Sequence, residues 1–406
     1  MIKKIKILIH YTHKETLGHT TRIIAIVNAL IEKYGHTVSL HVLQGGIPQS
    51  YVDFPPAAHI INIPHPFDSR ASFKGINGTR HHAIRAKFVL DQARIILPDI
   101  FITEFFPLGR MDYMPELLPT LKYLSQRKTR IYASVGYPYF QNLAAIHEKD
   151  FSTLFNNIIK LYDNILIHTP PELENKSFAK LFASQNLKKE YQSFFASIKS
   201  KTIYTGYVVP SRTAVPFSIP PTTISQRQHT IIVSRGSGTV YPKIIVNAIQ
   251  TQAILGDRYR FIIACGPASS SKEKELFTSF QKKYNTGHVF LFDHIPRLDT
   301  LFQDCAVSIS LCGYNTSVQL MQAGARTIII PYQRHHTQKT TNDQLARAHL
   351  MQRHFQSTVI SYLKLTPKTL AKAIQEKCQH PRPAPAPAEW FCGNATTADI
   401  LMQAVK

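Results

Sequence analysis

A glycine and a histidine stand together where an apolar run gives way to an amphipathic one, in "TLGHTTR" at residues 16–22. Gly18 permits a tight turn or a close backbone approach, and Thr20 or Thr21 can cap a following helix. His19 would project from this turn. Because histidine titrates near neutral pH, His19 could take a proton from a hydroxyl nucleophile. The alternative is that His19 is an ordinary polar loop residue.

Two further turns contain glycine and polar residues that could hold a nucleotide. "SRGSGTVYP" at 234–242 places Arg235, Gly236 and Ser237 between an apolar run and a helical pattern, as in a phosphate-binding turn. It contains neither GxxxxGK[ST] nor GxGxxG, which disfavours a P-loop ATPase. "FDHIPRLDTLF" at 292–302 could hold a base against the backbone near Phe292 and His294. For both segments the alternative is a purely structural turn.

A fourth turn, in "SLCGYNTSVQLMQAG" at 310–324, could bind an anion. A strand ending near Leu311 is followed by Gly313, and the segment from Asn315 to Ser317 can open a helix. The N–H groups and the dipole at that helix terminus would favour a diphosphate. Beyond a further strand that ends at Pro331, four side chains could bond hydroxyls or phosphates: Gln338, Asn342, Gln344 and Arg347.

Other titratable residues give weaker indications. Glu104 follows the strand-like run "DIFITEF" and could act as a second acid or base, after His19. Histidine pairs at 81–82 and 335–336 raise the question of a metal. Adjacent side chains diverge on a helix, and no third ligand stands at helical spacing, so we expect no metal site.

These turns belong to a regular alternation of apolar, β-rich runs with helix-length segments. One series of runs ends near Tyr207, and a second extends from "TIIVSRG" to "RTIIIPY". Such an alternation predicts parallel sheets covered on both faces, with ligands at the carboxyl ends of the strands. A segment rich in Pro, Ser and Thr after Tyr207 reads as a linker. We therefore predict an α/β protein with two doubly wound domains, 1–207 and 208–385, and a C-terminal helix within 386–406 that could pack back on the first domain.

Composition indicates the class of protein and its compartment. The chain has 406 residues, of which 44% are hydrophobic, which is enough for a core in each domain. No apolar run approaches the roughly 18 residues of a membrane span, and no signal-peptide core is evident. The five cysteines are odd in number and lack paired metal-ligand spacing, so we expect reduced thiols in a cytoplasmic protein.

The charge favours an anionic partner. Lys plus Arg exceed Asp plus Glu by 22, which suits a phosphorylated substrate, an anionic membrane surface or nucleic acid. No aromatic RNA-binding motif or zinc module supports nucleic acid. Arg80, Lys87 and Arg94 recur every seven residues in a predicted helix and would share one face. They predict peripheral contact with the inner face of a membrane; an ordinary solvated face, or a generally basic proteome, is the alternative.

Taken together, these motifs resemble the GT-B glycosyltransferases of the MurG-like branch, closest to predicted glycosyltransferases that share its C-terminal domain. The resemblance covers most of the chain in order and is strongest from Ser308 to Ala348. It rests on the segments "LGHTTR", "YTGYV", "CGP", "GYNTSVQLMQAG" and "NDQLARA".

The resemblance implies a GT-B fold, in which two Rossmann-like domains face a central cleft. It also implies an inverting, metal-independent transfer of sugar from a nucleotide-diphosphate donor, usually UDP-linked, with no cofactor. The acceptor, a lipid-linked molecule or a glycan, would bind the N-terminal domain, where His19 would be the base. The donor would bind the C-terminal domain. The candidate site residues are His19 and Glu104 for catalysis, and, for substrate binding, Gly18, Thr20, Arg22, Arg235, Gly236, Ser237, Phe292, His294, Ile295, Gly313, Asn315, Thr316, Ser317, Gln319, Gln338 and Gln344.

The sequence departs from the family pattern at two places in the donor half. Gln319 stands where the family usually has an acidic residue for the ribose hydroxyls, and an amide can bond them only without charge assistance. A long segment before Gln344 makes Gln338 a second candidate for the sugar contact. Two other functions remain open: a nucleotide-sugar epimerase of the same architecture, and a non-catalytic protein that binds an anionic ligand or nucleic acid.

Overall fold

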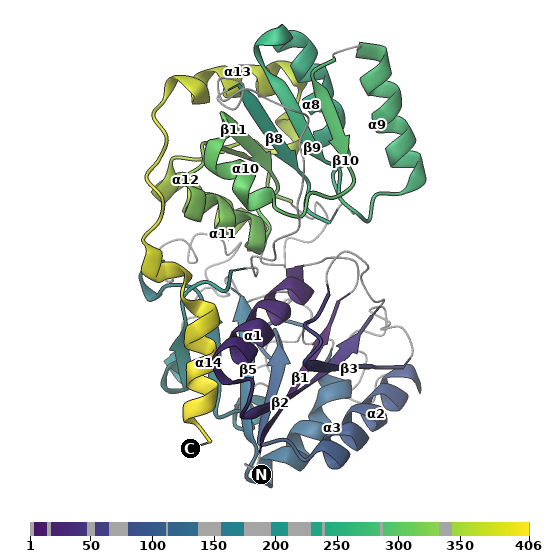
Figure 1. Ribbon diagram of the computed structural model, residues 1–406, viewed down its shortest axis with the longest axis vertical. Helices are drawn as coiled ribbons and strands as arrows, with labels where there is room; N and C mark the ends of the chain where they lie inside the picture. The colour runs from purple at the N-terminus through teal and green to yellow at the C-terminus, as the bar shows by residue number, and fades with distance from the viewer. Residues whose placement is uncertain are drawn as a thin grey trace. The chain divides into compact units, whose positions relative to one another are not determined.

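The structure, a computed structural model, describes residues 4–13, 18–46, 53–64, 80–110, 113–136, 156–173, 196–209, 229–237, 240–284, 287–332 and 343–405. These residues form two compact units (Figure 1). The first unit contains the described residues up to Val209, Asp343 and those from Glu389 onward. The second contains those from His229 to Tyr332 and from Gln344 to Ala388. The C-terminal residues therefore return to the first unit after the second is complete.

The first unit is built on a parallel sheet of seven strands in the order β3-β2-β1-β4-β5-β6-β7. Apolar, β-branched residues form most of its central strands, which are buried on both faces, as a sheet covered by helices requires. The strands are β1 (Ile5–Thr12), β2 (Val38–Gly45), β3 (Ala58–Asn62), β4 (Ile100–Glu104), β5 (Arg130–Gly136), β6 (Asn164–His168) and β7 (Thr202–Tyr204).

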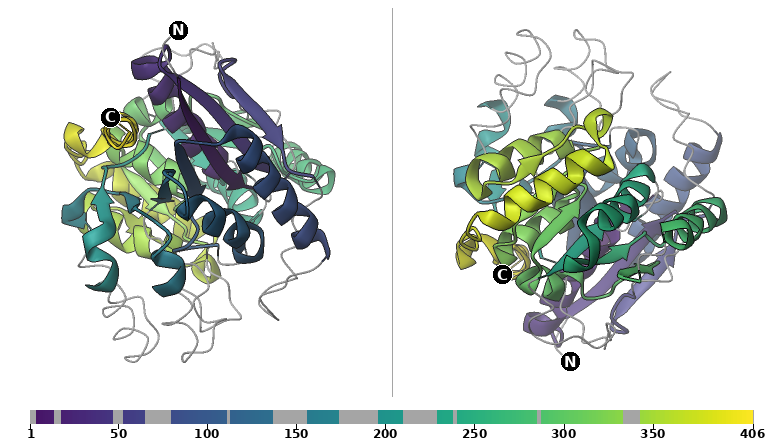
Figure 2. Two further views of the ribbon diagram at one scale, coloured as in Figure 1. Left: turned by 90° about the horizontal axis from the view of Figure 1, so that it is seen from below. Right: turned by 90° about the horizontal axis from the view of Figure 1, so that it is seen from above.

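Helices cover both faces of this sheet, as the left view of Figure 2 shows. α1 (Gly18–Tyr34) and α14 (Gly393–Gln403) lie side by side on one face, and α2 (Arg80–Ile96) and α3 (Met114–Ser125) lie side by side on the other. Leu401 and Met402 of α14 are buried in the same core cluster as Ile23 of α1 and Ile9 of β1. The C-terminal helix is thus a structural part of the first unit.

The second unit has a parallel sheet of six strands in the order β10-β9-β8-β11-β12-β13. The strands are β8 (Thr230–Ser234), β9 (Arg260–Ala264), β10 (Val289–Phe292), β11 (Val307–Ser310), β12 (Thr327–Ile329) and β13 (Thr358–Val359). The helices are α8 (Lys243–Leu255), α9 (Ser271–Tyr284), α10 (Leu298–Asp304), α11 (Tyr314–Ala323), α12 (Asp343–Phe355) and α13 (Pro367–Gln379).

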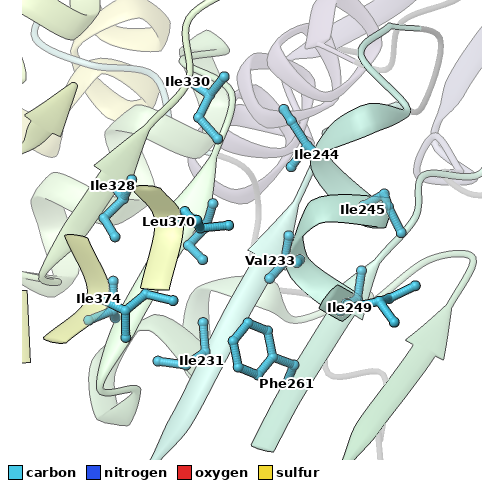
Figure 3. Packing of buried hydrophobic residues seen from close by; sticks show 14 of the residues in the cluster. Ile231, Val233, Ile244, Ile245, Ile249, Phe261, Ile328, Ile330, Leu370 and Ile374 are labelled. Atoms are coloured by element: carbon cyan, nitrogen blue, oxygen red, sulfur yellow. The ribbon is translucent and has the colours of Figure 1, made fainter. Parts of the chain in front are cut away.

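One face of this second sheet packs against α8 and α13, which lie side by side in the right view of Figure 2. Figure 3 shows the core between them: Ile231 and Val233 of β8 meet Ile249 of α8 and Ile374 of α13. α10, α11 and α12 lie on the opposite face (Figure 1). Both sheets are therefore covered on both sides, which confirms the predicted α/β class with two doubly wound sheets.

The strand orders place three of the predicted turns at special positions. In each sheet the order reverses direction next to the first strand, between β1 and β4 and between β8 and β11. Open parallel sheets bind ligands at such a reversal, outside the carboxyl ends of the strands. The turns at His19, Gly236 and Gly313 follow β1, β8 and β11. The segment at Phe292 follows β10, at a sheet edge.

The sequence pattern does not predict β3 or β13. Both are edge strands that contain half-buried or exposed residues and no fully buried one, so neither has the buried apolar run that marks the central strands. An edge strand forms because it pairs with one neighbouring strand, and a local sequence pattern does not show that pairing.

The two connections between the units are tied to each other inside the first unit. The N–H of Tyr207 donates to the carbonyl of Trp390 at 2.6 Å, and that of Gly393 donates to the carbonyl of Tyr207 at 3.1 Å. The side chain of Asn394 bonds both the N–H and the carbonyl of Val209. A Cβ on Gly393 would lie 2.6 Å from backbone atoms of Gly206 and Tyr207, so only glycine permits this approach.

None of the helices in the described ranges has the length and hydropathy that a membrane span requires.

A matched pair of substitutions on α8 tests the core of the second unit. Ile249 is fully buried, whereas Ile254 on the same helix is 53% exposed. We expect Ile249→Ala to lower the free energy of unfolding by about 2–5 kcal/mol, because it leaves a cavity, and Ile254→Ala to lower it by less than about 1 kcal/mol. Denaturant unfolding followed by circular dichroism measures both; equal losses would contradict the core assignment.

Candidate functional site

His19 and Glu104 meet at the carboxyl edge of the first sheet. His19 lies in the first turn of α1, and Glu104 is the last residue of β4, the strand beside β1. The Nδ1 atom of His19 lies 2.6 Å from Oε2 of Glu104. Arg22, one turn further along α1, donates from Nη2 to Oε1 of the same carboxylate. Glu104 is fully buried, while the side chain of His19 is 16% exposed.

The charges around Glu104 determine which of the two groups can act as a base. Burial alone would raise the pKa of the Glu104 carboxyl, but the charges and hydrogen bonds of His19 and Arg22 lower it to about 2. Glu104 is therefore ionised at neutral pH and can only accept hydrogen bonds. His19 donates its Nδ1–H to this carboxylate, which leaves Nε2 as the basic atom of the neutral ring.

Phe105 holds this pair from the side. Its ring meets the His19 imidazole edge to face at a centroid distance of 5.1 Å, and the Arg22 guanidinium lies 4.9 Å from its centroid. Phe105 has a left-handed φ of 64°, a conformation that costs a non-glycine residue energy. Its N–H donates to the carbonyl of Ser134 on β5, which helps to keep the residue in place.

The sequence does not predict two buried polar networks in the first unit. His168, at the end of β6, bonds Ser134 through Nε2 and Thr205 through Nδ1, both at 2.8 Å, and burial lowers its pKa to about 3. His168 is therefore neutral, and it is too buried to reach a substrate. In the sequence, the only sign of this network is that His168 is a polar residue at the end of an apolar strand.

The other network lies on the α2 and α3 face of the sheet. Glu116 of α3 accepts from His10 at 2.6 Å and from Nε of Arg85 at 2.6 Å, and Arg85 also bonds Oγ1 of Thr12 at 3.3 Å. Burial raises the pKa of Glu116, but His10 and Arg85 bring it down to about 2. This network holds Thr12, the last residue of β1, the strand that precedes α1 and His19 in the chain.

In the second unit, Arg235 follows β8 and is fully engaged within the protein. Its Nε donates to the carbonyl of Cys265 at 2.7 Å, its Nη1 to Glu273 at 2.9 Å and its Nη2 to Ser269 at 2.7 Å. These bonds join the end of β8 to the segment between β9 and α9 and to the first turn of α9. A substrate contact by Arg235 stays a prediction, and the geometry gives this guanidinium a structural role as well.

The turn beyond Arg235 presents backbone groups. Gly236 has a left-handed φ of 68°, and no described atom lies within 4 Å of where its Cβ would be. The carbonyl of Ser237 accepts a hydrogen bond from Ala268 at 2.8 Å, which fixes the turn against the following segment.

The N-terminus of α11 lies in the turn after β11, at the strand-order reversal of the second sheet. Gly313 is its N-cap, and the first bond of the helix runs from the Ser317 N–H to the Gly313 carbonyl at 2.9 Å. The N–H groups from Tyr314 to Thr316 precede this ladder and face the helix terminus. The Ser317 hydroxyl donates back to the carbonyls of Gly313 and Tyr314 and is buried, so of the predicted residues Thr316 has the more accessible hydroxyl.

The remaining donor candidates differ in their surroundings. Gln344 lies in the first turn of α12, and its Oε1 accepts from the N–H of Cys312 and of Tyr332. Gln319 is half-buried on α11. The carbonyl of Phe292, the last residue of β10, accepts from the N–H of Cys265. Beyond this strand Ile295 is buried, and burial lowers the pKa of His294. Gln338 lies outside the described residues.

Comparison with known proteins gives a family for part of the chain and a fold for the whole of it. Residues 231–396 match the model of the glycosyltransferase family 28 C-terminal domain. The glycosyltransferase SnogD from Streptomyces nogalater has the same architecture, with a TM-score of 0.59 and 16% identity over 100% of both chains. The chain is a glycosyltransferase with a GT-B fold.

Two other solved structures have the same fold. Acinetobacter baumannii MurG aligns with a TM-score of 0.51 and 12% identity, over 98% of this chain and 99% of its own. Phytolacca americana UGT2, solved with UDP-2-fluoro-glucose and pterostilbene, aligns with a TM-score of 0.59 and 12% identity over 99% and 100%. A search of curated protein sequences finds no match. The predicted resemblance to MurG-like GT-B glycosyltransferases is thus confirmed.

Within this glycosyltransferase, most of the predicted residues lie at the strand-order reversal of one sheet or the other, whereas Phe292, His294 and Ile295 lie at the β10 edge of the second sheet. Gly18, His19, Thr20, Arg22 and Glu104 gather at the reversal of the first sheet. The turns after β8 and β11 gather at the reversal of the second. Among the described residues, no group of His, Cys, Asp or Glu is arranged to hold a metal ion. The individual roles of these residues stay predictions.

The charge on Glu104 gives a stability prediction. Its pKa in the folded protein, about 2, lies below the ordinary value of 4.5, so its contribution to stability is present above pH 4.5 and is lost as the pH falls toward 2. A shift of that size corresponds to about 3 kcal/mol. We expect Glu104→Gln to cost about that amount at pH 7 and progressively less below pH 4.5.

Denaturant unfolding at several pH values measures this difference. Glu376→Gln, at an exposed carboxylate on α13, is the control and should cost less than about 1 kcal/mol throughout. A cost for Glu104→Gln that does not change between pH 7 and pH 3 would contradict the ionised, charge-paired state of Glu104.

Proposed function

We propose that the protein transfers a sugar from a UDP-linked donor to an acceptor hydroxyl, with inversion at the anomeric carbon and without a metal. The family 28 match supports glycosyl transfer. The observation that carries the mechanism is the His19–Glu104 pair, a base oriented by a buried carboxylate at the reversal of the first sheet.

Support for a nucleotide-diphosphate donor comes from the second unit. The backbone N–H groups at the start of α11 and the positive end of its dipole suit a diphosphate. The turn at Gly236 follows β8, which pairs with β11, the strand that precedes α11. Siraitia grosvenorii and Phytolacca americana glycosyltransferases of the same fold were solved with UDP and a UDP-sugar analogue. The sequence contains no Asp-x-Asp motif, which suits a site where fixed dipoles stabilise the diphosphate.

The proposed reaction needs one proton acceptor. The acceptor hydroxyl gives its proton to Nε2 of His19 as its oxygen bonds the anomeric carbon. The bond from that carbon to the diphosphate oxygen breaks, and its electron pair leaves with the nucleotide diphosphate. The Glu104 carboxylate stabilises the imidazolium that forms, and Arg22 and Phe105 keep the ring in one orientation.

Removal of the base should separate catalysis from donor binding. We expect His19→Ala to lower the transfer rate by about 10² to 10⁴ with little change in UDP affinity, because the base acts in the transition state. His36→Ala, at an exposed histidine after α1, is the control. Product analysis with UDP-sugar tests the assignment: normal turnover by His19→Ala would contradict it, and conversion of the nucleotide sugar without any acceptor would indicate an epimerase.

A charge placed at the α11 terminus tests the donor site. An aspartate at position 316 suits the helix dipole but would repel a diphosphate. We therefore expect Thr316→Asp to weaken UDP binding at least tenfold without loss of stability, and Thr316→Asn to change it much less. Calorimetric titration of UDP measures the affinities. Equal affinity in both variants would exclude a diphosphate at this terminus.

We also propose peripheral contact with an anionic membrane that holds the acceptor, and its support is the surface of α2. Lys87 is 78% exposed and Arg94 is 55% exposed, and Ile95 and Leu97 are exposed nearby. Asp91 forms ion pairs with Lys87 at 2.5 Å and with Arg94 at 3.6 Å, and it reduces the net charge of this face. The side chain of Arg80 lies outside the described residues.

Vesicle sedimentation tests this surface. We expect binding to anionic vesicles at low salt, none to neutral vesicles, and a loss of binding in the double variant Lys87→Glu with Arg94→Glu. Lys282→Glu with Lys283→Glu on α9 makes the same charge change in the second unit and serves as the control. No preference of the wild-type protein for anionic vesicles would refute the proposal.

A further inference from the structure

Cys312 links β11 to α11, and helix α12 holds both of its backbone polar groups. Its N–H donates to Oε1 of Gln344 at 3.2 Å, and its carbonyl accepts from Nε of Arg347 at 2.8 Å. Gln344 and Arg347 stand three residues apart and so share one face of α12. Because Cys312 is fully buried, water cannot take over these bonds, and their loss would leave buried groups unpaired.

The same oxygen of Gln344 also holds the neighbouring strand. The N–H of Tyr332, just beyond β12, donates to Oε1 of Gln344 at 3.0 Å. Two backbone donors on one atom require that atom to be the oxygen, which settles the orientation of the amide. Gln344 thus joins the ends of β11 and β12, and Nε2 is the atom left for a ligand.

Tyr332 extends this connection to the turn after β8. Its ring meets the ring of Tyr241 edge to face at 5.0 Å, and Tyr241 stacks on Tyr362 at 3.7 Å. Tyr241 has a left-handed φ of 54°, so the rings hold a backbone conformation that an isolated residue would leave. Tyr241, which lies between β8 and α8, is therefore linked through Tyr332 and Gln344 to the turn that contains Gly313.

We propose that Gln344 and Arg347 are positioning residues that fix the N-terminus of α11 and the turn after β8 at the spacing a diphosphate requires. This inference rests on the proposed function, which places the donor at these turns. In this inference Gln344 acts by holding the backbone of Cys312 and Tyr332, and it does not act as the sugar contact that the family resemblance implies.

The chemistry of Gln344 suits this role. A side chain that accepts from two backbone N–H groups needs an oxygen, which either glutamine or glutamate could provide. A carboxylate would also place a negative charge near the proposed diphosphate. The neutral amide gives the same two bonds without that repulsion.

Variants at three positions of α12 separate positioning from contact in the full chain. We expect Gln344→Leu and Arg347→Met each to weaken the binding of UDP and of UDP-glucose by the same factor, about tenfold. In the double variant the loss should be smaller than the product of the two, because both residues act on Cys312. Gln352→Leu, on the exposed side of the same helix, is the matched control and should bind as the wild type does.

Gln344→Glu provides a second arm that does not depend on removing the hydrogen bonds. Hydrogen exchange should show that the amides of Cys312 and Tyr332 lose protection in Gln344→Leu and keep it in Gln344→Glu. We expect the glutamate variant to bind UDP less well at low salt and to approach wild-type affinity as salt rises, whereas the leucine variant stays weak relative to the wild type.

The outcomes decide between three readings. A loss confined to UDP-glucose, with UDP affinity retained, would make Gln344 a sugar contact and overturn the inference. Unchanged UDP affinity in Gln344→Leu, despite lost amide protection, would also overturn it. If the wild-type protein binds neither UDP nor UDP-glucose, the proposed donor itself is wrong, and the inference fails with it.

Discussion

A carboxylate that is buried away from water needs a cation or hydrogen-bond donors beside it. The candidate site of the first unit depends on this need at Glu104. Its partners come from α1, which brings His19 to one oxygen and Arg22 to the other. The Arg22 guanidinium and the ring N–H of His19 give each oxygen of this buried carboxylate a partner, and they attach the start of α1 to the end of β4. The bond from Nδ1 of His19 to the Glu104 carboxylate fixes the orientation of the ring. It therefore also fixes the direction in which Nε2, on the other side of the ring, points.

In the second unit, side chains fix the turns mainly by hydrogen bonds to the backbone. The ends of β8, β11 and β12 all carry turns, and the side chains that follow β8 and lie on α12 bond the backbone at these points. Arg235 uses its charge inside the protein, against Glu273. What remains at the surface of these turns is a set of N–H groups and glycines, which is the kind of surface that can approach a diphosphate closely.

Sequence reasoning predicts the parts of this molecule that are encoded locally. The apolar runs of the central strands, the glycines at Gly18, Gly236 and Gly313, and the helix starts beside them are visible because each depends on a few consecutive residues. Contacts across long separations are not visible. His19 and Glu104 are 85 residues apart, and only the parallel order of β1 and β4 brings them together. The partners of Arg235 and Gln344 are hidden for the same reason, since a polar residue in a turn looks alike whether it faces a ligand or the backbone.

The return of the chain to its first unit has a consequence for biosynthesis. The ribosome releases residues 4–209 early, but Ala398, Leu401 and Met402 complete the core around Ile23 and Ile26. Until α14 is synthesised, that apolar face of α1 and the sheet has no cover, although every strand described in the second unit has already been made. The nascent first half must therefore wait in an incomplete state, and it is at this stage that the polypeptide is most exposed to chaperones and to self-association.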